Sequence, residues 1–597
     1  MKAGVRRDWL KPLSLGLACL FASALFATAR AGPDFGRYLD WSRAFARGDI
    51  FELWGPILSP NKVPLTQWFH GTGLIFALPQ ILTGQSFDPE RSALAAGWLA
   101  GMVFWWAMYR LLFRAAAGDV PLTIFGMGAA FVGTHAGFYS HTHGSESVGY
   151  ALAAVLALVL VNGRPWRIRE ALVGGAAAAL LVVVRSNLAL IALPATVLLG
   201  ARAVAARRVA GPRKVSAALG WLIGASAIGL LQVALFNRWM TGDYLQSPYV
   251  FGGDGFHSLE FGSPQLLAVL AHPWHGLLPY HPLYAIGMAA VIALVLRPGS
   301  RRERVGWLVL GAFVLIQLYI QGSWYVWWLG TGTFGQRGMS ITAVLLVPAL
   351  VTVIGRDPSG GKFGKGLWIL LTVVACLWSF LLLLQGETGF SSYVELREAQ
   401  LQQLAVLTRP ASLLPLLGGL ILPGGILIWI LRRHQPPRSH PLTNWAAGLL
   451  SILSFSYLGL KLAGGSQESI GNFGQLGLAL AFVVFLTTWS FGRRFVRRAD
   501  EPERPDWAST AVGAGLVATF IATTVLFSRL AVRTERWIAT DGPPPRAMEC
   551  SSRVMWDEVR ASFEEYQFAA GFESQKTALE TFLIRSGGAE CPELALP

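Results

Sequence analysis

The sequence predicts an all-α polytopic membrane protein, and three observations support this fold class. Of the 597 residues, 53% are hydrophobic and 14% are charged, whereas soluble globular chains carry about 25% charged residues. The apolar residues occur in blocks, many of them near the ~20 residues that a helix needs to cross a bilayer. The basic residues gather between these blocks, in every second connection. Together these features exclude an ordinary soluble, disordered or collagen-like chain.

The apolar blocks predict about 13 to 15 transmembrane helices. Two of the blocks, 148–163 and 171–184, are short, so the number stays open by one or two. In chain order the expected spans are 12–29, 93–113, 120–139, 148–163, 171–184, 188–204, 216–236, 277–296, 305–321, 339–355, 366–384, 411–431, 445–463, 475–491 and 508–530.

The first apolar block has two interpretations. Residues 1–31 combine a basic start, an apolar stretch and the sequence Ala29-Arg30-Ala31, which resembles a signal peptidase site. We favour an uncleaved first helix, because the apolar stretch is long and because cleavage would leave Asp34 almost at a free terminus.

The distribution of basic residues predicts the orientation. The formal net charge is +15, and the cytoplasmic loops of membrane proteins are rich in Lys and Arg. The N-terminus is basic, so it is expected in the cytoplasm. Counting from there, every expected cytoplasmic loop is basic, as shown by Arg110 and Arg114; Arg164, Arg167 and Arg169; Arg207, Arg208, Arg213 and Lys214; Arg297, Arg301, Arg302 and Arg304; Arg356, Lys362 and Lys365; Arg432, Arg433 and Arg438; and Arg493, Arg494, Arg497 and Arg498. The excess charge therefore sets topology, and no nucleic-acid partner is expected.

Two outside segments are long. The first loop, 30–92, contains an apolar stretch at 70–83 that is too short to span, and we expect it to form a helix at the membrane interface. The tail, 531–597, has a helical pattern near 551–584 and is expected to form a small soluble extracytoplasmic appendage. It contains Cys550 and Cys591, which can pair if the tail faces an oxidising compartment; the sequence leaves this pairing open.

The first outside loop contains a series of polar residues in a recognisable order. Asp34 lies just beyond the first helix, where a carboxylate can accept a proton from a bound hydroxyl. It is followed by Tyr38, by Gly48-Asp49, and by Lys62-Val63-Pro64-Leu65 before Trp68. This order resembles the first periplasmic loop of the GT-C glycosyltransferases, in particular the protein mannosyltransferases and the lipid A aminoarabinose transferase. These families use a polyprenyl-phosphate-linked sugar as donor.

The resemblance extends over residues 12–355. Glu146 takes the place of a second outside acidic residue, in the short loop 141–147. Residues 271–283 resemble a His-Gly-Leu, His-Pro-Leu signature of an uncharacterised bacterial branch, and so do Gly322–Trp328 followed by Phe334–Arg337. One departure is Lys62-Val63-Pro64, where the family usually has Lys-Pro-Pro.

The resemblance implies a GT-C-like bundle with three regions. Residues 1–355 would form the catalytic transmembrane module, 356–530 additional transmembrane helices, and 531–597 the tail. The implied activity is inverting transfer of a hexosyl or pentosyl group from the lipid-linked donor to a hydroxyl of a glycan, lipid or protein. The implied location is the bacterial inner membrane, with the N-terminus cytoplasmic and the reaction and the C-terminal tail extracytoplasmic.

The residue types suggest roles for the catalytic and phosphate-binding groups. Asp34 is the candidate base for the acceptor hydroxyl, and Glu146 is a second catalytic carboxylate that would orient the acceptor or a divalent cation (Mg or Mn). The leaving polyprenyl phosphate needs charge stabilisation, which cations near the membrane surface provide. Lys62 and Arg337 are the candidates, since Lys binds phosphate as a point charge and Arg binds it in a bidentate manner. An interfacial anchor is the alternative for Arg337.

The remaining candidates bind substrate or acceptor. They are Tyr38, His143, His272, His275, Trp324 and Trp327. The spacings His141-x-His143 and His272-x-x-His275 lack the Cys or paired acidic residues of a strong metal motif, so hydrogen bonding is the favoured role and no protein-bound metal is assigned. Trp and Tyr also gather at membrane interfaces by default, which is the alternative for the aromatic run 324–328.

Four further polar residues lie within or near apolar blocks. A charged residue in a membrane segment is by default a functional hypothesis, which applies to Arg185 unless the chain makes a tight outside turn there. Gln232, Gln317 and Gln321 either line a polar interior or make hydrogen bonds between helices.

Two other functions compete with the glycosyltransferase. A polysaccharide polymerase or ligase would be expected to have arginine-rich outside loops, but the loop 237–276 contains only Arg238 alongside Asp243, Asp254 and Glu260. A transporter or flippase would be expected to have paired charges within its helices, broken helices near the midplane and an internal repeat. The ionisable residues instead concentrate in outside loops, which favours the enzyme.

Overall fold

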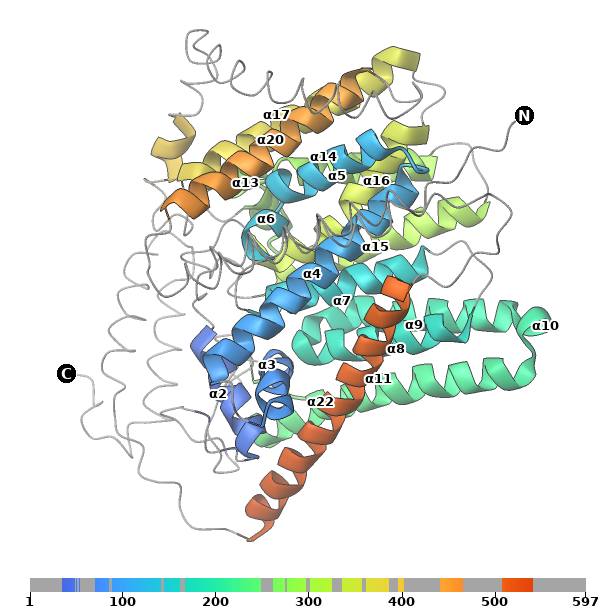
Figure 1. Ribbon diagram of the computed structural model, residues 1–597, viewed down its shortest axis with the longest axis vertical. Helices are drawn as coiled ribbons and strands as arrows, with labels where there is room; N and C mark the ends of the chain where they lie inside the picture. Colours follow the sequence, from blue (N-terminus) through green and yellow to red (C-terminus); the bar gives the residue numbers. More distant parts are fainter. Residues whose placement is uncertain are drawn as a thin grey trace, which may run out of the picture.

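The computed structural model describes a helical bundle (Figure 1). The described residues are 35–48, 50, 53, 70–84, 88–140, 144–161, 167–248, 261–273, 276–296, 301–324, 336–356, 361–385, 394, 396–401, 441–464 and 507–540. Their main elements are α2 (Phe35–Arg47), α3 (Gly71–Leu82), α4 (Pro89–Ala115), α5 (Val120–Gly133), α6 (Ala136–Tyr139), α7 (Ser145–Leu160), α8 (Ile168–Val184), η2 (Ser186–Leu188), α9 (Ala189–Ala205), α10 (Arg207–Ala210), α11 (Pro212–Thr241), α12 (Leu266–Ala271), α13 (Leu277–Tyr280), α14 (Leu283–Leu296), α15 (Arg301–Ser323), η3 (Arg337–Thr342), α16 (Ala343–Arg356), α17 (Gly361–Gln385), α20 (Pro441–Gly464) and α22 (Trp507–Thr540).

The all-helical prediction is confirmed for this part of the chain. Among the described residues, seven helical segments are long and apolar enough to cross a membrane; they are Pro89–Ala115, Ser186–Ala205, Pro212–Thr241, Gly306–Ser323, Arg337–Arg356, Gly364–Leu383 and Ala511–Arg536. Shorter apolar helices are α3, α5, α7 and α14. The expected spans 12–29, 411–431 and 475–491 lie outside the described residues, and the total of about 13 to 15 spans stays a prediction.

Several helix boundaries follow from capping residues. α4 begins with Pro89 directly after Asp88, whose side chain accepts a hydrogen bond from the Arg91 N–H at 2.7 Å. α5 begins in the same way after Asp119, which accepts from the Leu122 N–H at 3.1 Å. A side-chain acceptor at this position satisfies an N–H that the helix itself leaves unpaired. α4 therefore starts four residues earlier than the hydropathy pattern alone predicts.

Two expected spans are interrupted. The span 120–139 ends as α5 at Gly133, because the Thr134 hydroxyl accepts from the Ala136 N–H and starts the short helix α6. The span 277–296 is divided between α13 and α14 at His281-Pro282. The two interruptions meet, since His135 Nδ1 lies 2.9 Å from the Tyr284 hydroxyl.

Two helices correct the predicted division of loops and tail. α2 lies inside the first outside loop, where no helix was expected, and it buries Phe35, Tyr38, Trp41 and Phe45 along one face. α22 continues to Thr540 and so includes the first residues of the predicted tail. The hydropathy pattern missed α2 because polar residues separate its buried positions. The rest of the predicted tail lies outside the described residues.

α3 packs closely between α2 and α8, at two glycines. A Cβ atom on Gly73 would overlap the Trp41 Cβ, and one on Gly71 would lie 2.5 Å from the Val183 carbonyl oxygen. Small residues let helix backbones approach in this way. The apolar stretch predicted at 70–83 is thus confirmed as a helix.

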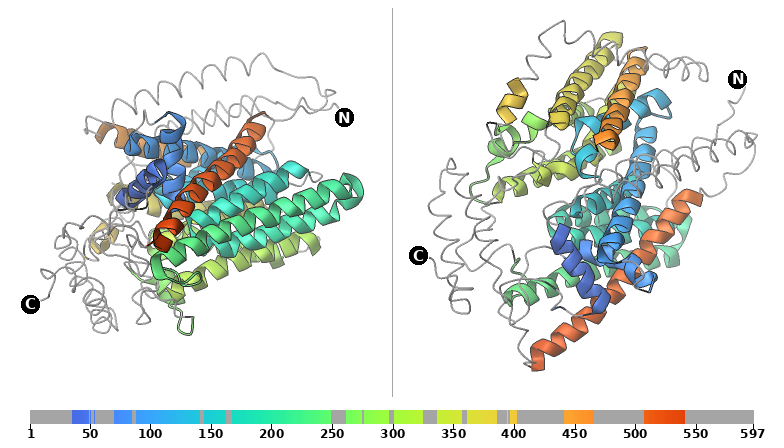
Figure 2. Two further views of the ribbon diagram at one scale, coloured as in Figure 1. Left: turned by 90° about the horizontal axis from the view of Figure 1, so that it is seen from below. Right: turned by 60° about the vertical axis from the view of Figure 1, so that its left-hand side comes forward.

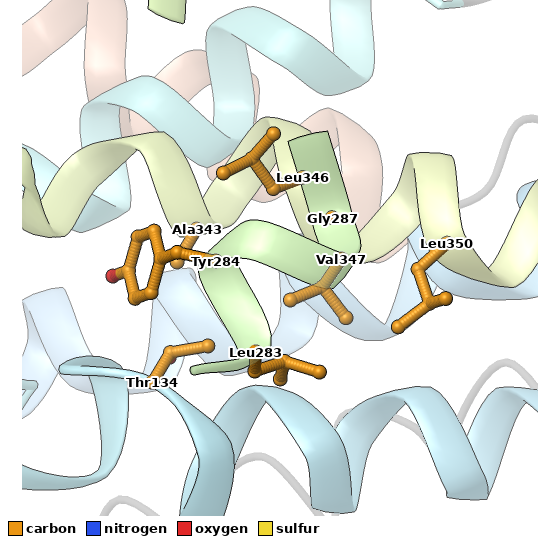
Figure 3. A pocket seen from close by; sticks show the side chains of 8 residues that line it. All are labelled: Thr134, Leu283, Tyr284, Gly287, Ala343, Leu346, Val347 and Leu350. Carbon is orange, nitrogen blue, oxygen red and sulfur yellow. The ribbon is translucent and has the colours of Figure 1, made fainter. Parts of the chain in front are cut away.

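α14 and α16 form a second close contact, shown in Figure 3. Leu283 and Tyr284 of α14 and Leu346 and Val347 of α16 line this contact, and a Cβ on Gly287 would lie 2.8 Å from the Leu346 Cβ. The gap between these side chains has no room for a water molecule. This seam is therefore packed core, with no space for a ligand.

The central helices give the bundle two chemically different ends. At one end, the Arg114 guanidinium at the close of α4 donates to the Leu158 carbonyl oxygen at 3.0 Å. Gly355 of α16 lies beside Ala115 at this same end, and Arg202 of α9 donates to the Val159 carbonyl oxygen at 2.8 Å. We call this the Arg114 end. The opposite end, at the start of α7, is called the Glu146 end.

The gathering of arginines at one end agrees with the predicted alternation of basic loops. Arg114, Arg202 and Arg356 come from three different helices and lie at the same end of the bundle. The structure contains no membrane, so the side on which this end lies stays a prediction.

α22 crosses the outside of the bundle over α8 and α11, as Figures 1 and 2 show from different directions. Its Glu535 carboxylate accepts from the Arg238 guanidinium at 2.6 Å and from the Trp239 indole N–H at 2.9 Å. Arg533 donates to the Gly48 carbonyl oxygen at 3.0 Å. These contacts join the last described helix to α11 and to the end of α2.

Candidate functional site

Glu146 is the centre of a polar cluster at the Glu146 end. It lies in the first turn of α7, directly after Gly144 and Ser145, and it is 4% exposed. The free N–H groups at the start of a helix favour a negative charge at this position. Ser145 Oγ lies 3.4 Å from Glu146 Oε2. The carboxylate is therefore buried at a position where the helix itself supports its charge.

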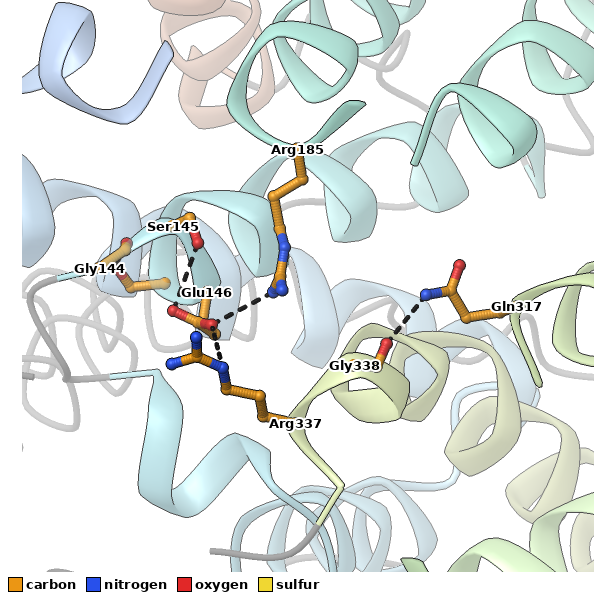
Figure 4. A network of polar contacts seen from close by, with 8 residues as sticks. Gly144, Ser145, Glu146, Arg185, Gln317, Arg337 and Gly338 are labelled. Atoms are coloured by element: carbon orange, nitrogen blue, oxygen red, sulfur yellow. Dashed lines mark hydrogen bonds and ion pairs between the residues drawn. The ribbon is translucent and has the colours of Figure 1, made fainter. Parts of the chain in front are cut away.

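Two arginines approach this carboxylate from different sides, as Figure 4 shows. Arg185 Nη1 lies 3.3 Å from Glu146 Oε1, and Arg337 Nε lies 3.7 Å from the same oxygen. The arginine side chains are 18% and 29% exposed, against 5% for the glutamate. Of these three described side chains, the two arginines are therefore the more exposed and the carboxylate the more buried.

The two arginines come from interruptions in regular structure. Arg185 separates α8 from η2 and has an extended backbone, with φ −148° and ψ 100°. Arg337 is the first residue of η3. Gly149 of α7 lies against Ile341, because a Cβ on the glycine would be 3.1 Å from the Ile341 Cδ1. The lack of a side chain on α7 lets η3 approach the start of that helix.

α15 holds the segment that carries Arg337. The Gln317 side chain donates to the Gly338 carbonyl oxygen at 2.9 Å, and the Gln321 side chain donates to the Gln336 side-chain oxygen at 3.3 Å. A Cβ on Gly338 would overlap the Gln321 amide. Both neighbours of Arg337 in the chain are thus fixed by two glutamines one turn apart. The expectation that Gln317 and Gln321 make hydrogen bonds between elements is confirmed.

A buried histidine and tyrosine network lies next to η3. The Tyr284 hydroxyl is 2.9 Å from His135 Nδ1 and donates to the Ser340 carbonyl oxygen at 3.2 Å. The His135 and His281 rings lie with their centroids 4.2 Å apart, and both histidines are buried. These groups join the interrupted helices to η3. Their burial favours a structural role over contact with a substrate.

The structure brings together two of the predicted site residues, Glu146 and Arg337. Tyr38 is 5% exposed, and its ring packs edge-on against Phe76 with 6.4 Å between centroids. His272 follows α12, and Trp324 follows α15. The start of α12 and the end of α15 are joined by a hydrogen bond of 2.7 Å, which the Gln265 N–H donates to the Gly322 carbonyl oxygen.

The structure leaves the predicted roles of these residues untested. Burial lowers the pKa of His272 below its ordinary value of 6.5, so its imidazole is neutral at pH 7. The other predicted site residues lie outside the described residues; they are Asp34, Lys62, His143, His275 and Trp327.

Arg185 was not among the predicted site residues. Its signal in the sequence was a charge between two apolar runs, which is a functional hypothesis by default. The sequence also offered the alternative of a tight turn, and the structure shows an interruption of this kind at η2. Its pairing with Glu146, 39 positions away in the chain, could not be deduced from one sequence.

A cavity of about 430 Å³ lies between the central helices. Near the Glu146 end it is lined by Leu181, one turn before Arg185, and by Ile341, one turn after Arg337. At the opposite end its lining includes Arg114 and Arg356. Nearly all other lining side chains are apolar, contributed by α4, α7, α8, α9, α15 and α16. The cavity is therefore lined mainly by apolar side chains.

Within the described part of the chain, no three His, Cys, Asp or Glu side chains come together in a way that could hold a metal ion. The expectation that Mg or Mn takes part therefore stays a prediction. No protein-family model, curated protein or solved structure matches this chain.

Proposed function

We propose that this chain is a membrane glycosyltransferase that transfers a sugar from a polyprenyl-phosphate-linked donor to a hydroxyl acceptor, with inversion, on the extracytoplasmic side. The observation that carries the proposal is the partly exposed arginine pair around Glu146. The order of motifs over residues 12–355, which resembles the GT-C glycosyltransferases, supports it from the sequence.

The charges of the cluster fit the donor phosphate. A sugar joined to a polyprenyl phosphate carries one negative charge on its phosphodiester, and two partly exposed guanidinium groups lie beside the buried Glu146 carboxylate. When the bond from the anomeric carbon to the phosphate oxygen breaks, the phosphate gains a second negative charge. Guanidinium groups held in place before the reaction stabilise this developing charge. Arg185 and Arg337 would therefore act mainly in the transition state.

The proposed reaction is a single displacement. The acceptor oxygen attacks the anomeric carbon on the face opposite the phosphate, and its proton passes to a carboxylate, for which Asp34 is the candidate. The electron pair of the breaking bond stays on the leaving phosphate, so the configuration inverts. A nucleophilic carboxylate is not needed for this route, and Lys62 is a further candidate cation for the phosphate.

We assign Glu146 a positioning role within this proposal. Its buried carboxylate is shared between two arginines, so its charge is already balanced and it is poorly placed to accept a proton from an acceptor. The carboxylate instead holds the two guanidinium groups close together despite their like charges. This refines the expectation from the sequence that Glu146 orients the acceptor or a cation.

The same observations do not separate the alternatives from the glycosyltransferase. A polymerase or ligase would share a phosphate-binding arginine pair, so the two enzymes differ in the acceptor and not in this cluster. The paired charges and interrupted helices at the Glu146 end are features that a transporter would also have. A transporter would move its substrate without consuming a lipid-linked sugar, and this difference decides between them.

The proposal is tested by measuring polyprenyl phosphate release from a radiolabelled lipid-linked sugar in membranes. The wild-type protein should release the lipid phosphate when acceptor is present, and Asp34→Asn should reduce the rate by about 100-fold or more. Undiminished turnover in Asp34→Asn would remove the assignment of the base. Uptake of a labelled solute into vesicles with no consumption of lipid-linked sugar would support the transporter instead.

A further inference from the structure

α7 and η3 meet in two successive contacts, one helical turn apart. The first joins Glu146 of α7 to Arg337 at the start of η3, with 3.7 Å between Oε1 and Nε. Tyr150 follows Glu146 by four residues on α7, and Ser340 follows Arg337 by three residues on η3. Side chains four apart on an α-helix share a face, and side chains three apart on a 3₁₀-helix are eclipsed. Tyr150 and Ser340 should therefore meet one turn below the Glu146 cluster.

The structure contains this second contact. The Tyr150 hydroxyl lies next to the Ser340 side chain, and the charge of the Glu146 carboxylate acts on it. Both Tyr150 and Ser340 are fully buried. Within the described part of the chain, their two side-chain oxygens have no other partner, and their own contact falls short of full hydrogen-bond geometry. Because a buried hydroxyl without a partner costs free energy, each of these oxygens stabilises the other.

Neighbouring side chains hold both members of this contact. The Tyr150 ring packs on the Phe104 ring of α4, with 5.0 Å between the centroids. The carbonyl oxygen of Ser340 accepts a hydrogen bond from the Tyr284 hydroxyl of α14 at 3.2 Å. Ser340 is thus contacted by tyrosines from two helices, through its backbone on one side and through its side chain on the other. Only the Tyr150 contact connects η3 to the helix that carries Glu146.

We propose that Tyr150 is a positioning residue, whose hydroxyl holds η3 against α7 through Ser340 and so keeps Arg337 beside Glu146. Its effect on turnover rests on the proposed function, because a guanidinium group stabilises the leaving phosphate best when it is held in place before the reaction. Tyr150 acts through Arg337 and does not contact the donor, since it is fully buried below the cluster.

The first part of the test measures backbone hydrogen exchange by mass spectrometry on the purified full-length protein, which requires no turnover. Tyr150→Phe removes the hydroxyl and keeps the ring that packs on Phe104. Exchange in peptides that cover η3 should become about 3- to 10-fold faster, as expected for the loss of one hydrogen-bonding contact. The matched control is Tyr109→Phe, because Tyr109 is also a buried tyrosine but lies near the Arg114 end of α4. It should leave exchange in η3 unchanged.

The second part of the test measures donor kinetics. Tyr150→Phe should lower kcat by about 3- to 10-fold and leave the donor KM within about twofold, because the arginine acts mainly in the transition state. In an Arg337→Gln background, Tyr150→Phe should cause no further loss, since residues that act through one another are not additive. Ser340→Ala removes the partner hydroxyl and should reproduce both the exchange and the kinetic effects, and it replaces Tyr150→Phe if that variant fails to fold.

Two results would overturn the proposal. One is unchanged exchange in η3 of both Tyr150→Phe and Ser340→Ala, whatever their kinetics. The other is an equal loss of kcat on Tyr150→Phe with and without Arg337, which would mean that Tyr150 acts by another route. Faster exchange in η3 together with a wild-type protein that releases no polyprenyl phosphate would support the contact and refute the proposed function. The two failures are therefore distinguishable.

Discussion

Two arginine–glutamate pairs in this protein have almost the same geometry and lie at opposite ends of the bundle. Arg185 and Glu146 are 3.3 Å apart with side chains 18% and 5% exposed, and Arg202 and Glu170 are 3.3 Å apart with side chains 19% and 5% exposed. They differ in their surroundings. Arg202 also donates to carbonyl oxygens at the end of α7, whereas the Glu146 carboxylate is shared with a second arginine.

This difference predicts different results for the same substitution. Arg185→Gln should lower kcat/KM for the lipid-linked donor by about 10- to 100-fold, because a charge-assisted hydrogen bond to phosphate is worth about 1.5–3 kcal/mol. Arg202→Gln should leave kcat/KM within about twofold while lowering the thermal unfolding midpoint, since it removes only structural contacts. Steady-state kinetics and thermal melts of the two variants check this, and equal kinetic effects would contradict it.

Glu146 itself should separate donor binding from turnover. In Glu146→Gln the two guanidinium groups lose their shared counter-charge and repel each other, while the net positive charge available to a phosphate increases. We therefore expect kcat to fall by about 10-fold or more and the donor KM to stay the same or decrease. A donor KM that increases while kcat is unchanged would mean that Glu146 contacts the substrate directly.

The sequence predicts two of the three cluster residues, Glu146 and Arg337, as site residues, and it does not predict the third, Arg185. Glu146 and Arg337 were named because they occupy places in a resembling order of motifs, and the structure places them together. Arg185 was noticed only as a charge between apolar runs. No spacing rule links it to Glu146, because their contact depends on how α7 and α8 pack, which is a tertiary property.

At the scale of elements, the position of Arg337 depends on the hydrogen bonds that Gln317 and Gln321 of α15 make to its two neighbours in the chain. Gly338→Ala would place a Cβ onto the Gln321 amide, so the segment would have to move and Arg337 with it. Donor turnover should fall by about 10-fold or more, since overpacking and displacement of this kind cost about 1–3 kcal/mol. The check is donor kinetics together with the unfolding midpoint.

The matched control for this prediction is Gly306→Ala, also associated with α15. A Cβ on Gly306 meets nothing within 4 Å, and alanine favours a helix more than glycine does. This variant should keep full activity and be at least as stable as the wild type. Similar losses of donor turnover in both variants would show that the effect comes from α15 in general and not from the glutamine contacts on either side of Arg337.

The sequence predicted the long helices well and their interruptions poorly. Hydropathy located α4, α11 and α17 within a few residues because a span needs a long apolar run. The interruptions at Thr134 and at His281-Pro282 occur inside such runs, where hydropathy stays high. They depend on a hydroxyl that caps a backbone N–H and on contacts between distant helices, which a single apolar pattern does not encode.

At the scale of the whole molecule, the two ends of the described bundle carry different polar groups. The acidic centre of the site and its interrupted helices lie at the Glu146 end, while Arg114, Arg202 and Arg356 lie at the other. Because the cytoplasmic loops of membrane proteins are rich in Lys and Arg, the Arg114 end should face the cytoplasm. This orientation is required by the proposed function, since it places the Glu146 site on the extracytoplasmic side.

Cysteine labelling in intact cells tests this orientation. In a background with the four native cysteines replaced by serine, Thr83→Cys would report on the Glu146 end and Arg208→Cys on the Arg114 end, because Thr83 precedes the start of α4, Arg208 follows α9, and both are exposed. A membrane-impermeant maleimide should label Thr83→Cys in intact cells, and Arg208→Cys only after the membrane is opened. The reverse pattern would place the Glu146 site in the cytoplasm and exclude a lipid-linked donor on the outer side. Labelling of both before opening would mean that the Arg114 end does not face the cytoplasm.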